Sequence, residues 1–280
     1  MLKGYVQITR PVNSVIAGLA VLLGVIIASG TVALDSLVLI PVVALITAAG
    51  NVINDYFDRE IDAVNRPERP IPSKKVSEKG ALIFSTVLFI TGILLCLFAN
   101  YLCLFLALLN SFLLIAYAMK LKGMPLVGNL AVSYLSASIF LFGGAIAGPG
   151  GLIQNFVIAA ITFFAMLSRE MLKDAEDIEG DKTGGAKTLP MIIGVKKTGV
   201  LAFLMAFLAV FASFLPLFRF WGITYIAMIS IADIIILYAA FRGLSCDDSE
   251  SLRESGATGL LKKGMFLALL IFIISAVLIG

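Results

Sequence analysis

The sequence predicts an all-α membrane protein that crosses the bilayer nine times. Its 280 residues are 60% hydrophobic, with a mean hydropathy of +1.04. A soluble domain would need a larger share of charged surface residues. The apolar residues fall into runs near the ~20 residues that one helix needs to cross the hydrocarbon core. These runs are residues 12–34, 37–54, 80–99, 101–119, 126–147, 152–168, 199–218, 221–241 and 264–280.

Local features agree with spanning helices. The first run follows Lys3 and Arg10 and, at about 22 residues, is longer than the apolar part of a secretory signal peptide, so we expect it to be retained. The second run contains Pro41, which a helix tolerates near its start. Residues 243–263 are expected to form a short helix or a flexible cover. We expect one transmembrane domain over residues 1–280.

The charged residues predict the orientation. If the N-terminus is cytoplasmic, 20 of the 21 Lys and Arg residues fall on the cytoplasmic side, and only Arg219 falls outside. Sixteen of the 18 acidic residues share that side, the exceptions being Asp35 and Asp233. The positive-inside rule therefore predicts a cytoplasmic N-terminus and an external C-terminus.

Several residue types limit the chemistry. The chain has no histidine, which excludes His-ligated zinc and Ser-His-Asp triads. Cys96, Cys103 and Cys246 form no CxxC motif and are expected to be inert. Asp233 lies deep in a predicted span, where a charge is costly. It is protonated, faces the bundle interior, or marks a shifted eighth helix.

Two acidic stretches repeat each other, the first from Asn51 to Asp62 and the second from Glu170 to Asp181. On an α-helix, which turns about 100° per residue, the aspartates of each stretch form a stripe along one face. Two facing stripes would repel each other unless cations lay between them, so the pattern predicts bound divalent metal. The aspartates of the second stretch come 119 residues after those of the first (174 − 55): Asp55, Asp58 and Asp62, then Asp174, Asp177 and Asp181.

The ligand chemistry favours magnesium. Carboxylate and carboxamide oxygens are hard ligands that suit Mg²⁺ or Mn²⁺, and Mg²⁺ completes its shell with water and phosphate oxygens. Two facing clusters fit two or more Mg²⁺ ions that grip a diphosphate. Gly184 and Gly185 permit close backbone approach to such a ligand. Candidates for phosphate contacts are Arg69, Lys187, and either Lys120 or Lys122.

These stretches resemble the signatures of the UbiA superfamily of intramembrane prenyltransferases. NDYFDREID (Asn54 to Asp62) followed by RPERPIPS (Arg66 to Ser73) is similar to the first signature. DAEDIEGD (Asp174 to Asp181) followed by GAKTLP (Gly185 to Pro190) is similar to the second. The nine-span layout also matches, so the resemblance covers essentially the whole chain. It implies nine helices around a central cavity on the cytoplasmic side, where Mg²⁺ holds an isoprenyl diphosphate.

The resemblance also implies roles for individual residues. Catalysis is expected to depend on Asp58, Asp62, Asp177 and Asp181. The metal positions carried over are Asn54, Asp55, Asp58, Asp62, Glu170, Asp174, Asp177 and Asp181, of which Glu170 matches a ligand in only some members. The substrate-binding candidates are Arg10, Asn13, Arg66, Arg69, Lys120, Lys122, Arg169 and Lys187. Tyr117-Ala-Met-Lys120-Leu-Lys122 departs from the family's Tyr-x-x-x-Lys-Arg spacing, so which lysine meets the diphosphate stays open.

Within the superfamily, the sequence is most similar to the digeranylgeranylglyceryl phosphate synthases of archaeal ether-lipid synthesis. The likeness lies in TRPVN (Thr9 to Asn13), PLVGN (Pro125 to Asn129) and the stretch from Arg169 to Asp181. It implies Mg²⁺-dependent transfer of a geranylgeranyl group from its diphosphate to the hydroxyl of geranylgeranylglyceryl phosphate, forming an ether bond. Basic residues not needed by the diphosphate would serve the acceptor's phosphate.

Two other functions stay open at this point. The first is prenylation of an aromatic acceptor, such as 4-hydroxybenzoate or a naphthoate, in quinone synthesis. The second is divalent cation transport, although transporter sites usually lie near the midplane rather than at helix ends. The expected partners are an isoprenyl diphosphate, a lipid-like phosphate acceptor and the bilayer, with no nucleic acid. The expected location is the cell membrane, with the active site on the cytoplasmic side.

Overall fold

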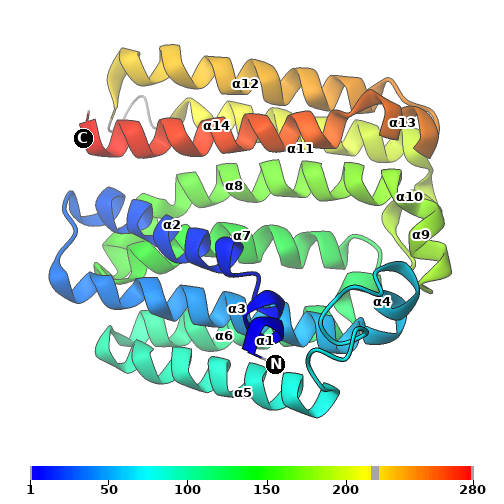
Figure 1. Cartoon of the computed structure of the whole chain (residues 1–280). Helices are drawn as coiled ribbons and strands as arrows, with labels where there is room; N and C mark the ends of the chain where they lie inside the picture. The colour runs from blue at the N-terminus through cyan, green and yellow to red at the C-terminus, as the bar shows by residue number, and fades with distance from the viewer. Residues whose placement is uncertain (1, 216–220, 279–280) are drawn as a thin grey trace. The chain divides into compact units, whose positions relative to one another are not determined.

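The computed structural model describes residues 2–215 and 221–278, and within them every regular element is a helix (Figure 1). Nine spans in these ranges are long and apolar enough to cross a membrane, which confirms the predicted fold class. They are α2 (Pro11–Ser29), η1 with α3 (Leu34–Val38 and Leu39–Phe57), α5 with η2 (Glu78–Leu95 and Cys96–Phe98), α6 (Tyr101–Met119), α7 (Val127–Ala145), α8 (Gly148–Glu176), α11 (Val195–Ser213), α12 (Gly222–Leu244) and α14 (Ala257–Leu278). Arg219 and the end of the predicted run 199–218 lie outside the described residues.

Short helices fill several of the connections. They are α1 (Leu2–Ile8), α4 (Arg59–Asn65), η3 (Leu121–Gly123), α9 (Ile178–Thr183), α10 (Leu189–Ile193) and α13 (Ser249–Ser255). Of the two options for residues 243–263, the structure shows the short helix, α13. The proline-rich segment after α4 forms turns rather than a helix, as its composition predicts.

The largest difference from the sequence prediction is the length of α8. The apolar run was expected to end at residue 168, but the helix continues to Glu176. The reason is that the added turns are amphipathic: Met171, Leu172 and Ala175 are buried at helical spacing while charged residues lie between them. Hydropathy averaged over a window falls where these charged residues occur, so the predicted span ended too early. For the same reason α14 begins at Ala257, earlier than the predicted residue 264, with Leu261 fully buried.

The helices are grouped into two compact units. Unit 1 comprises residues 1–121 and 138–155, and unit 2 comprises residues 122–137 and 156–280. The chain therefore passes from unit 1 to unit 2 within η3, returns to unit 1 within α7 and enters unit 2 again within α8. Each unit contains one of the two acidic stretches.

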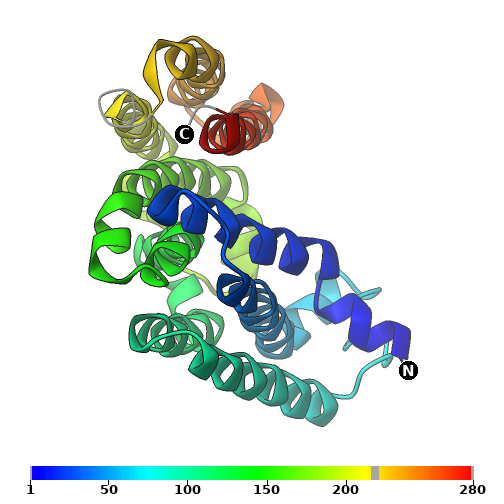
Figure 2. The ribbon, with the colours of Figure 1, turned by 90° about the vertical axis from the view of Figure 1, so that its left-hand side faces the viewer.

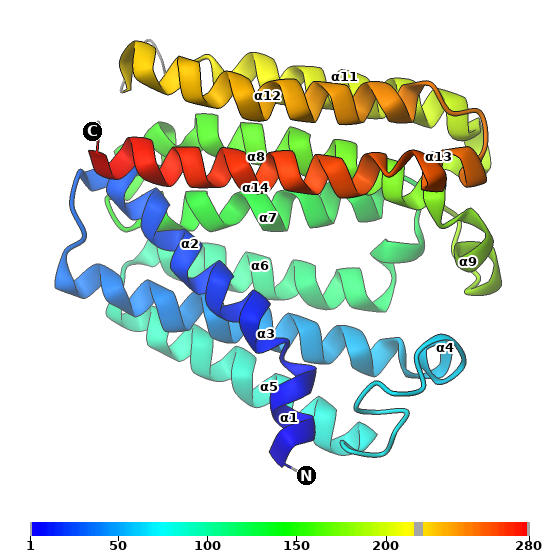
Figure 3. The ribbon, with the colours of Figure 1, turned by 45° about the horizontal axis from the view of Figure 1, so that its top comes forward.

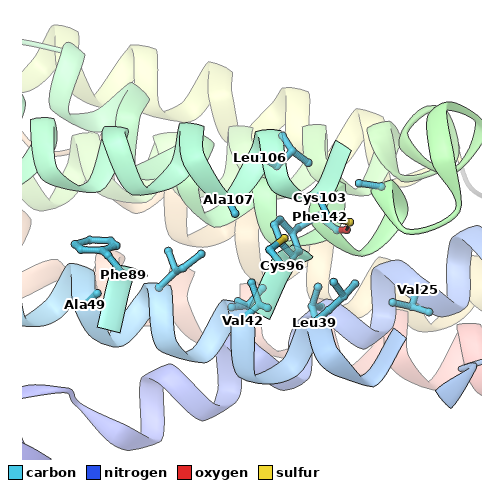
Figure 4. Packing of buried hydrophobic residues seen from close by; sticks show 14 of the residues in the cluster. Val25, Leu39, Val42, Ala49, Phe89, Cys96, Cys103, Leu106, Ala107 and Phe142 are labelled. Carbon is cyan, nitrogen blue, oxygen red and sulfur yellow. Dashed lines mark hydrogen bonds between the residues drawn. The ribbon is translucent and has the colours of Figure 1, made fainter. Parts of the chain in front are cut away.

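In unit 1, helix α3 packs against α2, α5 and α6 (Figure 2). Its buried positions recur every three or four residues, as a helix with one core-facing stripe requires. Val42 and Ala49 of that stripe belong to one buried cluster with Phe89 of α5, which lies beside Ala49, and Cys96 and Cys103 are buried in the same cluster as free thiols (Figure 4). This packing fixes the helix that carries the first acidic stretch.

Close backbone contact fixes α2 within the same unit. A Cβ added to Gly143, near the end of α7, would collide with the carbonyl oxygen of Val21. Buried Asn155 donates from Nδ2 to the carbonyl oxygen of Gly24 at 3.0 Å. Only small residues permit this approach between helices. This close packing fixes the position of α2, and Arg10 at its N-terminal end pairs with Asp55 of the first acidic stretch.

In unit 2, α12 packs against α11 and α14 (Figure 3). Asp233 of α12 is buried and accepts a hydrogen bond from Ser213 Oγ at 2.8 Å. The hydroxyl of Tyr225 donates to the main-chain oxygen of Ser213 at 2.7 Å. Of the explanations offered for Asp233, the interior-facing one is therefore the one observed, since a buried polar group needs such a partner.

Candidate active site

The two acidic stretches break their helices at equivalent residues. Helix α3 ends one residue before Asp58 and α4 begins one residue after it, and α8 and α9 flank Asp177 in the same way. The ψ angle is −2° at Asp58 and 14° at Asp177, near the bridge region in which many active-site residues lie. Across each break, the amide of the following aspartate still bonds back, Asp62 to Asp58 and Asp181 to Asp177, at 2.8 and 2.9 Å. The offset of 119 residues is therefore structural as well as sequential.

In the first stretch, arginines hold the outer two aspartates. Asp55 Oδ1 accepts from Arg10 Nη2 at 2.7 Å and from Arg69 Nη1 at 3.1 Å. The same Arg69 nitrogen donates to Asp62 Oδ2 at 2.7 Å. The side chains of Asp55 and Asp62 are only 6% and 7% exposed, so these ion pairs are largely shielded from water. Their charge is compensated by guanidinium groups from outside the helix.

The loop after α4 places Arg69. Among its polar and proline residues, Ile71 and Val76 are buried in a small cluster with Ile8 and Val52. These two apolar residues anchor the loop against unit 1. The Arg69 main-chain oxygen accepts from both the amide and the hydroxyl of Ser73. The guanidinium is therefore fixed before any ligand binds.

Arg10 has an unusual backbone for a non-glycine residue. Its φ and ψ are 49° and 64°, in the left-handed region, directly before Pro11 at the start of α2. Such strain persists only where surrounding contacts enforce it. Here the ion pair with Asp55 and the bond from Asn51 Nδ2 to the Thr9 carbonyl, at 3.1 Å, hold this corner.

The middle of the first stretch is arranged differently. Asn54 Nδ2 donates to Asp58 Oδ2 at 2.8 Å, so both side chains lie one helical turn apart on the same face. Asp58 is half-buried, unlike Asp55 and Asp62, which are buried. Asn54 and Asp58 thus present an amide and a carboxylate together at the helix break.

In the second stretch, an asparagine takes the place of an arginine. Asn129 Nδ2, in the first turn of α7, donates to Asp174 Oδ2 at 2.8 Å. Donor and acceptor are 45 residues apart in the chain, as Arg10 and Asp55 are. Asn129 also comes 119 residues after Arg10. The internal repeat therefore preserves the contact while changing the donor from charged to neutral.

The remaining acids of the second stretch lie close to one another. Arg169 Nη1 pairs with Glu170 Oε1. Asp177 is exposed and Asp181 half-buried. Burial raises the pKa of Asp181, and the neighbouring Asp177 carboxylate raises it further. A neighbouring carboxylate acts in this direction because two like charges close together disfavour the ionised form.

The predicted phosphate-binding residues are distributed over both units. Arg66 follows α4 and is exposed, and its amide bonds to the Asp62 carbonyl at 2.8 Å. Lys120 follows α6 and is exposed, as is Asn13 on α2. In unit 2, the Lys187 amide donates to the Gly123 carbonyl at 3.0 Å, which joins the loop of Lys187 to η3, the element of Lys122.

The residues of the two acidic stretches fit magnesium in their ligand chemistry. Among the described residues, no three Asp, Glu, Cys or His side chains gather closely enough to hold a metal ion by themselves. Mg²⁺ usually takes one or two carboxylates and fills its shell with water and substrate phosphates, so a full protein cage is not required. The repulsion between Asp177 and Asp181 is the observation that fits a cation, because a divalent ion there would relieve it.

Two sets of contacts made by the acidic stretches were not predicted from the sequence. Asn129 entered only through a family likeness, although its place 119 residues after Arg10 is a readable signal. The hydrogen bonds that Glu176 accepts from Arg253 of α13 and Thr258 of α14 correspond to no pattern in the sequence. Nothing in the sequence separates Asp55, which two arginines hold, from Asp58, which lies beside Asn54.

The chain matches known proteins over its whole length. The model of the UbiA prenyltransferase family matches residues 14–277. A digeranylgeranylglyceryl phosphate synthase from Methanoculleus marisnigri is 53% identical over 276 residues, covering 99% of both chains, and one from Thermococcus kodakarensis is 43% identical, covering 98% of both.

Solved structures agree. A structure from work on a digeranylgeranylglyceryl phosphate synthase in membranes has a TM-score of 0.86 and 38% identity, covering 99% of this chain and 98% of that one. A UbiA homolog from Archaeoglobus fulgidus bound to GPP and Mg²⁺ has a TM-score of 0.64 at 15% identity, covering 95% and 99%, and so shares the fold. With a family model matching nearly all of its residues, the chain belongs to the UbiA prenyltransferase family.

Proposed function

We propose that this prenyltransferase is a digeranylgeranylglyceryl phosphate synthase. In the reaction, the allylic C–O bond between the geranylgeranyl group and its diphosphate breaks. The hydroxyl oxygen of geranylgeranylglyceryl phosphate forms an ether bond to the same carbon, and its proton passes to a motif carboxylate or to the released diphosphate. The observation that carries the proposal is the full-length likeness to proteins of that name at up to 53% identity.

Both acidic stretches would serve this one reaction, within a single domain over residues 1–280. We assign the metal-binding role chiefly to the aspartates at and after each helix break, Asp58 and Asp62, then Asp177 and Asp181. Asn54 and Asp174 would contribute, and Glu170 would adjust the charge beside Arg169. When bound, Mg²⁺ supplies positive charge that stabilises the departing diphosphate.

The structure supports a separate role for Asp55. Its Oδ1 binds both Arg10 and Arg69, whereas Asp62, among the described side chains, accepts from Arg69 alone, through Oδ2. We therefore assign Asp55 to the orientation of two guanidinium groups and Asp62 to the metal. Arginine is well suited to phosphate oxygens because its planar donors match their geometry. In our proposal, Asp55 holds Arg69 beside the diphosphate site.

Other basic residues would bind phosphate from exposed positions. Arg66, Lys120 and Lys187 are exposed, and in our proposal they bind the diphosphate or the acceptor's phosphate. Lys122, Arg169 and Asn13 complete the set of candidates. A surplus of cations beyond those needed by the diphosphate favours a phosphate-bearing acceptor over an aromatic one.

The test is acceptor choice with purified protein. Labelled geranylgeranyl diphosphate would be offered with geranylgeranylglyceryl phosphate or with 4-hydroxybenzoate, each with Mg²⁺ and with EDTA. We expect an ether product from the glycerol phosphate, dependent on Mg²⁺, and none from the aromatic acid. Product from 4-hydroxybenzoate alone would instead identify an aromatic prenyltransferase. Asp58→Ala, with a native circular dichroism spectrum, serves as the inactive control.

A further inference from the structure

The end of α8 is held by a part of the chain that the internal repeat does not account for. Glu176 is the last residue of α8 and directly precedes Asp177. Thr258, in the first turn of α14, lies with its hydroxyl 2.7 and 2.8 Å from the two carboxylate oxygens of Glu176. Arg253, in α13, donates from Nη2 to the main-chain oxygen of Glu176 at 2.9 Å. Figure 1 shows α13 and the start of α14 at the same end of unit 2 as the end of α8.

Glu176 needs these partners. A carboxylate in the last turn of a helix faces the negative end of the helix dipole, which disfavours it. The final carbonyls of a helix also lack partners within the helix. Thr258 meets the first requirement by binding the carboxylate, and Arg253 meets the second while adding positive charge.

The segment that carries the two donors is rigid. Arg253 and Thr258 flank Gly256, whose φ of 62° lets α13 end and α14 begin within a tight turn. Leu252 and Ala257 on either side are fully buried. They belong to the same hydrophobic cluster as Leu172 of α8. The donors are therefore fixed against the helix whose end they hold.

The first stretch is held in a different way. The residue 119 positions before Glu176 is Phe57, whose ring packs against Tyr56 at 5.2 Å. There the arginines at positions 10 and 69 fix the stretch. The residues 119 positions later, Asn129 and Thr188, carry no charge. The second stretch thus lacks both guanidinium anchors, and the clamp from α13 and α14 supplies another.

We propose that Thr258 and Arg253 are positioning residues, which hold Glu176 so that Asp177 stays at the break between α8 and α9. This inference rests on the proposed metal-binding role of the second stretch. Neither residue needs to touch the substrate. Loss of the clamp would leave the fold in place but would weaken the binding of Mg²⁺ and diphosphate.

The test compares Thr258→Val, which removes the hydroxyl at nearly constant volume, with Thr258→Ser, which keeps it. Two readouts are measured: the Mg²⁺ concentration for half-maximal turnover, and the rise in thermal midpoint caused by Mg²⁺ with inorganic pyrophosphate in the absence of acceptor. We expect Thr258→Val to need about tenfold more Mg²⁺ in both, the size of one hydrogen bond to a charged group. Thr258→Ser should stay within about twofold of the wild type, because it keeps the hydroxyl donor.

Two further variants keep the result decisive. Arg253→Met removes the exposed second donor and should raise the Mg²⁺ requirement about threefold, even if Thr258→Val fails to fold. Thr198→Val is the matched control in the same unit, since its hydroxyl bonds to the Gly194 carbonyl of its own helix end. It should lower the thermal midpoint without changing the Mg²⁺ requirement.

The outcomes separate this inference from the proposed function. A wild-type Mg²⁺ requirement in both Thr258→Val and Arg253→Met would overturn the clamp. So would a Mg²⁺ requirement in Thr258→Ser as high as that of Thr258→Val. If the wild type makes no ether product but Mg²⁺ and pyrophosphate still stabilise it, and Thr258→Val loses that effect, the clamp stands and only the acceptor assignment is lost.

Discussion

Replacing Asp55 with asparagine tests whether this residue anchors arginines or binds metal. In the structure its Oδ1 lies 2.7 Å from Arg10 Nη2 and 3.1 Å from Arg69 Nη1, and its side chain is 6% exposed. Hydrogen bonds to charged groups contribute about 1.5–3 kcal/mol each. Arg10 is 37% exposed and will be partly solvated, so we expect a loss near the lower end for the pair, about 3 kcal/mol of unfolding free energy.

The assay is unfolding in mixed micelles, followed by far-UV circular dichroism because that signal reports all of the helices. Asp58→Asn should lose less than about 1 kcal/mol, since a neutral side chain at the helix break still pairs with Asn54. Glu60→Gln is the matched control: the carboxylate lies in the same stretch but is 86% exposed, so its loss should be within about 0.5 kcal/mol. If Asp55→Asn were as stable as the wild type and lost only Mg²⁺ affinity, the arginine-anchor assignment would be wrong and Asp55 would be a metal ligand.

Three other outcomes are expected. EDTA should abolish prenyl transfer and Mg²⁺ restore it, while Asp177→Ala should lose nearly all turnover with Mg²⁺ present and keep a native circular dichroism spectrum. Gly143→Leu should lower the yield of folded protein sharply, because the new side chain would collide with the Val21 carbonyl oxygen and overpacking costs about 1–3 kcal/mol or more. Gly150→Leu is the control, since a Cβ at Gly150 has no atom within 4 Å. The predicted orientation is tested by labelling single introduced cysteines with an impermeant maleimide, to which the buried native thiols should not respond. Lys75→Cys should react only after cell lysis, whereas Leu34→Cys should react in intact cells. The reverse pattern would place the active site outside the cell.

Some of the site was readable in the sequence and some was not. The spacing of Asp58 and Asp177 predicted two equivalent clusters, and both lie at helix breaks with the same main-chain hydrogen bonds. The family membership and the enzyme class followed from the same residues and are confirmed. The sequence treated Asp55 and Asp58 alike, however, because the arginines that hold Asp55 are not its neighbours in the chain. Arg10 lies 45 residues from Asp55, and only packing of α2 against α3 brings them together.

The sequence by itself determined the nine spans and the internal repeat. Continuous apolar runs long enough to cross a bilayer form helices, because a helix satisfies all of its backbone hydrogen bonds within the segment. The spacing of the aspartates can be read from the chain whatever the arrangement of those helices. Only the tertiary structure decided where α8 ends and which groups hold each carboxylate. Those depend on buried residues such as Leu172 and on donors such as Thr258, which lies 82 residues from its partner Glu176. Contacts at that separation come from packing, which local composition does not encode.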